Sequence, residues 1–429
     1  MSAIPRRLLP GTAVIAALTL VSGCGLSSSS VESGTNAKER GPITYAAGKD
    51  VSGVVPKLIK RWNEGHPGEK VTFIELPEDA NAQRQQMIQN AQLKTDTFSV
   101  LSLDVVWTAE FAANRWIDEI PQKSFPYDKT LAPINGTLKY RGKYFAMPYA
   151  SDGALLYYRK DLLDKAGIDK PPETWDEMRE VCRKVLGEKE SKTSCYAGQF
   201  EKYEGLTVNF AEAVHSTGGR ITDDKGNPTV DTPEAKRGLD NLVNGFRDGT
   251  IAKEAITYME EPGRRAFEKG KTLFFRQWPS MYGVSSNKSE NNEVAGKFGV
   301  APIPGEKETG VSSLGGHNLA LSSSARNKAT ALDFMRYMTS EQNSRRNLND
   351  GSLAPVYADL YDDPEMQREF PWLPVLKKSI LNAEPRPRVV RYGDATTAIQ
   401  DDAYAALTGK KSSSEALRSL QEKLRALTP

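Results

Sequence analysis

Acidic and aromatic side chains stand together in this sequence just beyond an apolar run. Asp104 ends the run of residues 98–103, and Trp107 follows three residues later. A carboxylate accepts hydrogen bonds from hydroxyl groups, and an indole offers a flat apolar face to the C–H groups of a sugar ring. The pair therefore indicates a site for a polyhydroxylated ligand, although Asp104 could instead cap a helix and Trp107 could instead pack in a core.

Similar groups stand next to two other predicted strands. Tyr149 and Asp152 precede a strand predicted over residues 155–159. Trp278 follows a strand predicted over residues 271–275. Ligands of open α/β sheets lie beyond the carboxyl ends of the strands, so we expect these groups to gather around one site.

A glycine pair is the last candidate. Gly315 and Gly316 would let backbone N–H groups approach a ligand closely. Paired glycines are more often simple turns, so this pair by itself indicates little.

Signatures of common enzymes are missing from the sequence. It has no G-x-S-x-G, H-E-x-x-H or G-x-G-x-x-G pattern. Residues 270–272 superficially match a phosphate-binding loop, but Arg265 occupies the position of a required glycine and an apolar strand follows. The three histidines have no metal-ligand spacing: His66, His215 and His317. We therefore expect a binding protein that is not an enzyme, with no cofactor and no metal.

The elements that must position these groups alternate between strands and helices. Strands are predicted over residues 43–47, 71–76 and 98–106. Helices are predicted over residues 54–63 and 81–93, the first with apolar residues at a helical period. This β-α-β-α-β order predicts a mostly parallel sheet covered by helices.

A second series of elements follows the strand at residues 155–159. Thr174, with Glu177 three residues later, has the pattern of a helix capping box. Residues 395–427 are predicted to be helical apart from a break at residues 409–412. Two further strands and one helix are predicted over residues 298–302, 319–321 and 329–338.

The first 40 residues have the pattern of a targeting segment and a tether. Arg6 and Arg7 precede an apolar stretch of about 14 residues, which suits a signal peptide and is shorter than the ~20 residues of a membrane-spanning helix. The stretch ends in a Val-Ser-Gly-Cys lipobox, so we expect cleavage of residues 1–23 and lipidation of Cys24. Residues 24–40 would be a flexible tether. The mature protein would then lie outside the cell, held at the membrane by its lipid; an ordinary signal with an incidental cysteine is the alternative.

Charge and cysteine content agree with export. Loss of Arg6 and Arg7 would reduce the 57 basic residues to 55, equal to the 55 acidic ones, and no basic stripe stands out. We therefore expect no nucleic-acid partner. Beside Cys24 only Cys182 and Cys195 remain, which predicts a disulfide in an oxidising compartment or, alternatively, two buried thiols.

Six segments spread over the mature chain share one family's order and spacing: residues 62–68, 104–107, 147–163, 172–177, 266–271 and 313–316. Together they resemble the extracellular solute-binding proteins of carbohydrate ABC importers. Within that family the sequence is similar to the trehalose/maltose-binding branch, which includes trehalose-binding lipoproteins of actinobacteria. The resemblance implies a monomeric subunit that captures an α-linked disaccharide and delivers it to the permease in the membrane.

The resemblance also implies which residues bind the sugar. Asp50 is the candidate for an acid near the first strand, and an arginine from the carboxyl-terminal part, Arg386 rather than Arg388, would reach into the site. The remaining implied contacts are hydroxyl binding by Arg84, Asp104 and Asp152, stacking by Trp278, and backbone hydrogen bonds from Gly315 and Gly316. Trp107 and Tyr149 complete the predicted site.

The implied fold is α/β, with two lobes of the type II periplasmic-binding-protein class. Each lobe would be a mostly parallel sheet flanked by helices. Lobe 1 would comprise residues 41–150 with 303–355, and lobe 2 would comprise residues 151–302 with 356–429. A hinge between the lobes would close on the ligand, and the permease would recognise the closed form.

Other functions remain compatible with the sequence. A lipoprotein of the same fold could bind another solute or act as a sensor or scaffold, and a glycoside hydrolase would need only two suitably placed carboxylates. Within the sugar-binding interpretation, trehalose competes with maltose and related α-linked glucosides.

Overall fold

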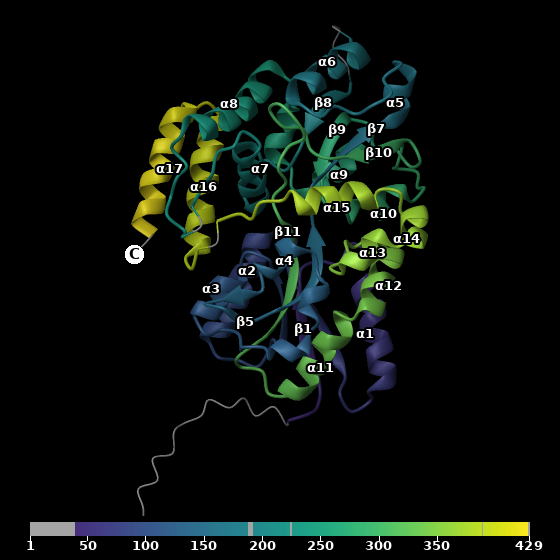
Figure 1. Ribbon diagram of the computed structural model, residues 1–429, viewed down its shortest axis with the longest axis vertical. Helices are drawn as coiled ribbons and strands as arrows, with labels where there is room; N and C mark the ends of the chain where they lie inside the picture. The colour runs from purple at the N-terminus through teal and green to yellow at the C-terminus, as the bar shows by residue number, and fades with distance from the viewer. Residues whose placement is uncertain (1–38, 188–191, 224, 388, 428–429) are drawn as a thin grey trace, which may run out of the picture. The chain divides into compact units, whose positions relative to one another are not determined.

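The computed structural model describes most of the chain (Figure 1): residues 39–187, 192–223, 225–387 and 389–427. The predicted signal peptide, Cys24, most of the predicted tether and Arg388 lie outside these residues. No helix in the described part of the chain is long and apolar enough to cross a membrane.

The first sheet has five strands in the order β2-β1-β3-β11-β6. β1 pairs in parallel with β2 and β3, whereas β11 is antiparallel to both of its neighbours, β3 and β6. β1 and β3 are almost wholly buried, which fits strands covered on both faces. The strands are β1 (Ile43–Ala47), β2 (Val71–Glu75), β3 (Val100–Asp104), β6 (Met147–Asp152) and β11 (Gly315–Leu321).

The second sheet has four strands in the order β10-β7-β9-β8. β8 and β9 are parallel, whereas β7 is antiparallel to both β9 and β10. These strands are β7 (Leu155–Arg159), β8 (Ser194–Ala197), β9 (Thr272–Gln277) and β10 (Phe298–Ala301). A two-stranded hairpin is formed separately by β4 (Lys139–Tyr140) and β5 (Lys143–Tyr144).

In each sheet one strand is antiparallel to all the other strands: β11 in the first sheet and β7 in the second. Each is the first strand that the chain forms after it crosses from the other sheet. Most strands of each sheet point toward the other sheet. The chain enters a sheet from that side after a crossing, so its first strand points away from the other sheet and is antiparallel to the rest. The predicted two-lobed α/β fold is therefore confirmed. Its two sheets are mixed and not mostly parallel, because only three of their seven ladders in the described chain are parallel and all four ladders made by β7 and β11 are antiparallel.

Helices lie in the connections between strands and in the chain after the last strand. The helices before β7 are α1 (Val54–Gly65), α2 (Ala80–Gln92), α3 (Thr108–Ala113) and α4 (Ala132–Asn135). Those between β7 and β11 are α5 (Lys160–Lys165), α6 (Trp175–Leu186), α7 (Glu204–His215), α8 (Pro233–Asp248), α9 (Glu260–Glu268) and α10 (Met281–Ser286). After β11 come α11 (Lys328–Met338), α12 (Glu341–Gly351), α13 (Ala358–Asp362), α14 (Pro364–Glu369), α15 (Leu373–Leu381), α16 (Tyr392–Leu407) and α17 (Ser413–Leu427).

Local signals in the sequence determine where several helices begin and end. The Thr174 hydroxyl accepts a hydrogen bond from the Glu177 backbone at 3.2 Å, and the Glu177 carboxylate accepts one from the Thr174 backbone at 3.1 Å. The predicted capping box at the start of α6 is therefore confirmed. The predicted break after α16 is also present, at Gly409 with its φ of 72°, and α16 and α17 lie side by side (Figure 1).

A disulfide joins α6 to β8 at the edge of the second sheet. It links Cys182 to Cys195, whose Cα atoms are 5.5 Å apart. Both cysteines are buried, and neither lines the cavity described below.

The crossings between the two sheets contact one another. Between β6 and β7, the Ala154 backbone donates a hydrogen bond to Ser312 Oγ at 2.7 Å in the crossing that leads to β11. Ser379 of α15 donates to the Ala154 carbonyl at 2.8 Å. A Cβ on Gly153 would lie 2.6 Å from Ser379 Oγ, so this contact requires a glycine. Three separate segments of the chain thus meet where the sheets are joined.

Candidate binding site

A cavity of about 300 Å³ lies between elements of the two sheets. The carboxyl ends of β3 and β6 with the start of β11 form one wall, and the starts of α7 and α9 with the segment after β9 form the other. The volume is at the lower end of the ~300–1,000 Å³ range of small-molecule sites. All predicted binding residues in the described chain except Arg84 line it: Asp50, Asp104, Trp107, Tyr149, Asp152, Trp278, Gly315, Gly316 and Arg386.

The pairing of β11 brings two acidic side chains together. Asp104 ends β3 opposite His317 of β11, and Asp152 ends β6 opposite Gly315 of the same strand. Because β3 and β6 run in the same direction on either side of β11, both carboxyl groups come to the same edge of the sheet. This edge faces the cavity, as expected for the carboxyl ends of strands.

The Asp152 side chain is buried beside the second acid, and this changes its pKa. Burial, and then the nearby charge of Asp104, raise its pKa to about 7, while Arg276 acts in the opposite direction. Near neutral pH this group is therefore divided between acid and carboxylate. It can donate or accept a hydrogen bond, and a sugar hydroxyl can complement either form.

Arg386 joins the two walls of the cavity. Its Nη2 donates to Asp104 Oδ1 at 2.7 Å, and its Nη1 donates to Glu204 Oε1 at the start of α7. Glu204 also accepts hydrogen bonds from the hydroxyls of Tyr392 and Thr396. Burial raises the pKa of the Glu204 carboxyl, and the Arg386 charge opposes this. The arginine is thus fixed by a buried acid that has no marked signal in the sequence, because a glutamate in the first turn of a helix is common.

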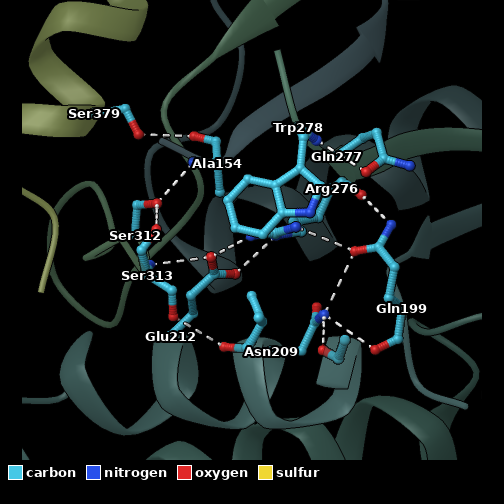
Figure 2. Close-up of polar contacts among 12 residues, drawn as sticks. Ala154, Gln199, Asn209, Glu212, Arg276, Gln277, Trp278, Ser312, Ser313 and Ser379 are labelled. Carbon is cyan, nitrogen blue, oxygen red and sulfur yellow. Dashed lines mark hydrogen bonds and ion pairs between the residues drawn. The ribbon is translucent and has the colours of Figure 1, made fainter. Parts of the chain in front are cut away.

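Trp278 presents an aromatic surface to the cavity. The Arg276 guanidinium lies 3.9 Å from the centre of its ring, so one face of the indole is covered (Figure 2). The ring edge packs against Gly315, where a Cβ would come within 2.8 Å of two ring carbons. Trp278 is only partly buried and lines the cavity, so it can stack on a ligand.

Trp107 combines the two roles that its position suggested. It is 2% exposed and packs in the core, and it also lines the cavity. Its Nε1 has no hydrogen-bond partner among the described residues. Asp104 likewise has a local role, since its Oδ1 accepts a hydrogen bond from the Val106 backbone at 3.1 Å. A ligand hydroxyl could accept from the indole N–H, which is otherwise unfavourable to bury unpaired.

Asp50 reaches the cavity but serves mainly to begin α1. Its Oδ1 accepts hydrogen bonds from the backbone of Ser52 at 3.0 Å and of Gly53 at 3.1 Å. Its Oδ2 accepts one from the Val55 backbone at 2.8 Å. These hydrogen bonds explain why an acid stands at position 50. Its contact with a ligand stays a prediction.

The structure does not bring Arg84 to the cavity. Its Nε donates to Glu110 Oε2 at 2.8 Å, and its Nη2 donates to Glu110 Oε1. The guanidinium also lies against Gly393 at the start of α16. The sequence marked Arg84 only by resemblance, and the buried acid in α3 that holds it is remote in sequence. Its contact with a ligand stays a prediction.

The glycine pair forms no turn: both residues lie within β11. Gly315 gives room to the Trp278 ring. Gly316 has a φ of 108°, and a Cβ there would lie 2.2 Å from the Ala150 carbonyl oxygen. The predicted hydrogen bonds to a ligand are a separate expectation, since protein packing alone requires both glycines.

The cavity is also lined by four polar residues that the sequence did not single out: Tyr203, Glu260, Glu261 and Arg264. Tyr203 donates a hydrogen bond to Glu260 Oε2 at 2.7 Å. Arg264 donates two to Glu261, at 2.9 and 2.6 Å. The spacing of these three charged residues in α9 is that of an ordinary solvated helix face, so only the tertiary structure shows that they line the cavity.

The cavity wall is richer in acids than in cations. Lys49, Arg264 and Arg386 are its only lysine and arginine residues in the described part of the chain. Such a wall favours neutral ligands over anionic ones. Its acids are Asp50, Glu78, Asp104, Asp152, Glu204, Glu260 and Glu261. Within the described ranges, no group of three or more His, Cys, Asp or Glu residues is arranged to hold a metal ion.

Comparison with known proteins gives a consistent result. The family described as "Bacterial extracellular solute-binding protein" matches residues 48–344. A "Probable ABC transporter-binding protein" of Deinococcus radiodurans is 33% identical over 369 residues, which cover 83% of this chain and 86% of that protein. A "Mannitol-binding protein" of Pseudomonas aeruginosa is 24% identical, over 85% of this chain and 88% of the relative.

A solved structure extends this similarity to the fold. Maltose-bound MalE3 of T. maritima superposes with a TM-score of 0.84 at 29% sequence identity. The superposition covers 90% of this chain and 100% of that one. The two-lobed arrangement is therefore common to both chains.

Proposed function

This chain belongs to the family of bacterial extracellular solute-binding proteins, and we propose that it captures a neutral sugar outside the cell for an ABC importer. It is a binding protein and not an enzyme. The ligand would be an α-linked disaccharide, with trehalose as the first candidate and maltose or a related glucoside as the second. Closure of the two lobes would trap it, and the permease would recognise the closed form.

One observation carries this proposal: acidic groups and an aromatic platform from opposite walls face the same cavity. Asp104 and Asp152 belong to the first sheet, whereas Trp278 follows a strand of the second. Sugars need hydrogen-bond acceptors for their hydroxyls and a flat apolar surface for their C–H faces. The maltose-bound relative supports a disaccharide, and the mannitol-binding relative supports a polyol as the second candidate class.

The acidic wall makes a specific prediction about selectivity. Trehalose is expected to bind, whereas trehalose 6-phosphate, which differs by an anionic group, should bind at least about tenfold more weakly because like charges repel in a site of low dielectric. Isothermal titration calorimetry with trehalose, its 6-phosphate, maltose and mannitol measures this directly. Added salt should narrow the difference. Equal affinity for the phosphate would contradict the charge argument, and no binding of any neutral member would contradict the proposed function.

The proposed location rests on the amino-terminal pattern. If Cys24 carries lipid, Cys24→Ala should leave the protein unprocessed or release it into the medium, because the described chain has no alternative membrane span. Fractionation of cells followed by immunoblotting gives the distribution, with wild-type protein as the control. A fully processed variant that stays in the membrane fraction would disprove lipid anchoring.

A further inference from the structure

A buried ion pair lies directly behind the aromatic platform. We propose that Arg276 and Glu212 are positioning residues of the binding site: together they hold the Trp278 ring against the strand that joins the two lobes. This inference rests on the proposed function, because it concerns how the sugar platform is kept in place. Neither residue lines the cavity, so neither is expected to touch the ligand.

Arg276 is held by hydrogen bonds with two residues, Glu212 and Gln199 (Figure 2). Its Nε and Nη2 donate to the two carboxylate oxygens of Glu212 at 2.9 and 2.6 Å. Its Nη1 donates to Gln199 Oε1 at 3.3 Å, and the Gln199 amide donates to the Arg276 carbonyl at 2.9 Å. The arginine is 1% exposed. A bidentate pair leaves the guanidinium plane no freedom to turn, so its orientation under the indole is determined.

The order of residues at the end of β9 explains why the guanidinium contacts the indole. Arg276 and Trp278 are two positions apart, and side chains two apart in an extended chain point to the same side. The 3.9 Å distance between the guanidinium carbon and the ring centre places a flat cation against one face of the indole. A lysine at this position could keep the charge but not the flat contact.

The other end of the ion pair holds the crossing strand. Glu212 Oε1 accepts a hydrogen bond from the Ser313 backbone at 3.1 Å. Two residues further along, Gly315 begins β11 and packs against the edge of the Trp278 ring. The contacts therefore form a closed circuit that runs from Ser313 through Glu212, Arg276 and Trp278 to Gly315, two residues from where it began.

This circuit of contacts lies at the point where the chain passes from one lobe to the other. Ser312, next to Ser313, accepts the hydrogen bond from Ala154 in the first crossing, and Ser379 contacts Ala154 from α15 (Figure 2). Two positions of the crossing strand, Ser313 and Gly315, are thus tied to the second lobe. These contacts therefore tie the platform to the segment that joins the two lobes.

A simple stabilising role predicts something different from a positioning role. Hydrophobic residues often replace a buried ion pair without loss of stability. Such a replacement would keep the fold but would remove the flat cation from the indole. The two roles can therefore be separated by measuring the indole environment and ligand affinity in folded variants.

The test uses Arg276→Lys, with Arg159→Lys as the matched control. Arg159 makes the same kind of bidentate pair, with Asp161 at 2.8 and 2.7 Å, at the end of the neighbouring strand β7 and away from the cavity. The Trp278 contribution to fluorescence is obtained by subtracting the spectrum of Trp278→Phe in each background. Arg276→Lys should change the wavelength and quenching of this contribution without ligand, and should weaken trehalose or maltose binding by about tenfold or more. Arg159→Lys should change neither.

A second variant keeps the proposal testable if Arg276→Lys does not fold. Arg276→Gln with Glu212→Gln removes both charges together, so no unpaired charge is left buried. It should also bind about tenfold or more weakly than wild type. Wild-type affinity and Trp278 emission in either folded variant would overturn the positioning role. If the wild type bound neither trehalose, maltose nor mannitol, the proposed function would fail, while the ligand-free Trp278 emission would still report whether Arg276 holds the indole.

Discussion

Replacing Arg386 with methionine is expected to lower the free energy of unfolding of the ligand-free protein by about 3–5 kcal/mol. The guanidinium is 1% exposed and pairs with Asp104 and Glu204. Its loss would leave the Glu204 carboxylate buried without a cation, and would leave Asp104 without the contact that holds it at the cavity. Urea denaturation of the ligand-free variant gives the change in stability, and calorimetry with the best neutral sugar gives the change in affinity.

A compensated variant separates the two effects. Arg386→Met with Glu204→Gln removes the unpaired charge, so it should regain much of the lost stability. Sugar binding should nevertheless remain weakened by about tenfold or more, because Asp104 has still lost its partner. If Arg386→Met alone unfolded at the same urea concentration as the wild type, the arginine would not be held as the structure indicates.

Removing the aromatic platform with Trp278→Ala should weaken sugar binding by about ten- to a hundredfold, which corresponds to about 1–3 kcal/mol of lost stacking. The ligand-free protein should melt close to the wild type, because the ring is only partly buried and faces the cavity. Asp104→Asn should show a similar loss of affinity, since the carboxylate would no longer accept from sugar hydroxyls. Thermal melting without ligand and calorimetry with trehalose and maltose test both variants.

Trp62 provides the matched control. It is 4% exposed, stacks on His66 at 3.8 Å between ring centres, and does not line the cavity. Trp62→Ala should therefore cost about 3–5 kcal/mol of stability and leave the affinity of the folded protein unchanged. If Trp278→Ala melted as early as this control and bound sugar normally when folded, Trp278 would be a core residue and not a platform.

The same distinction applies to the other predicted site residues. Asp104, Asp152 and Trp278 could be identified from sequence because each stands beside a recognisable strand, and the carboxyl ends of strands are where such folds bind ligands. Asp50 and Arg84 were indicated only by the resemblance to the family. Only their partners, the backbone of α1 and the Glu110 carboxylate, show that both side chains already have other contacts.

The sequence by itself determined the features that depend on neighbouring residues. The strand over residues 43–47, the helix from residue 54, the capping box at Thr174 and the break before α17 follow from periodicity, caps and glycine positions. The order of these elements was enough for the α/β class, because short connections and right-handed crossings leave few alternatives.

Only the tertiary structure decided which polar groups pair across the cavity. Glu204 and Arg386 are 182 residues apart, and Glu212 and Arg276 are 64 apart, yet each pair shares a buried ion contact. In the sequence, Arg276 is one charge within an apolar strand, and the two glutamates are ordinary helix residues. Their pairing depends on how the elements pack, because a buried charge is stable only beside its counterion, and no local pattern specifies a contact between segments so distant in the chain.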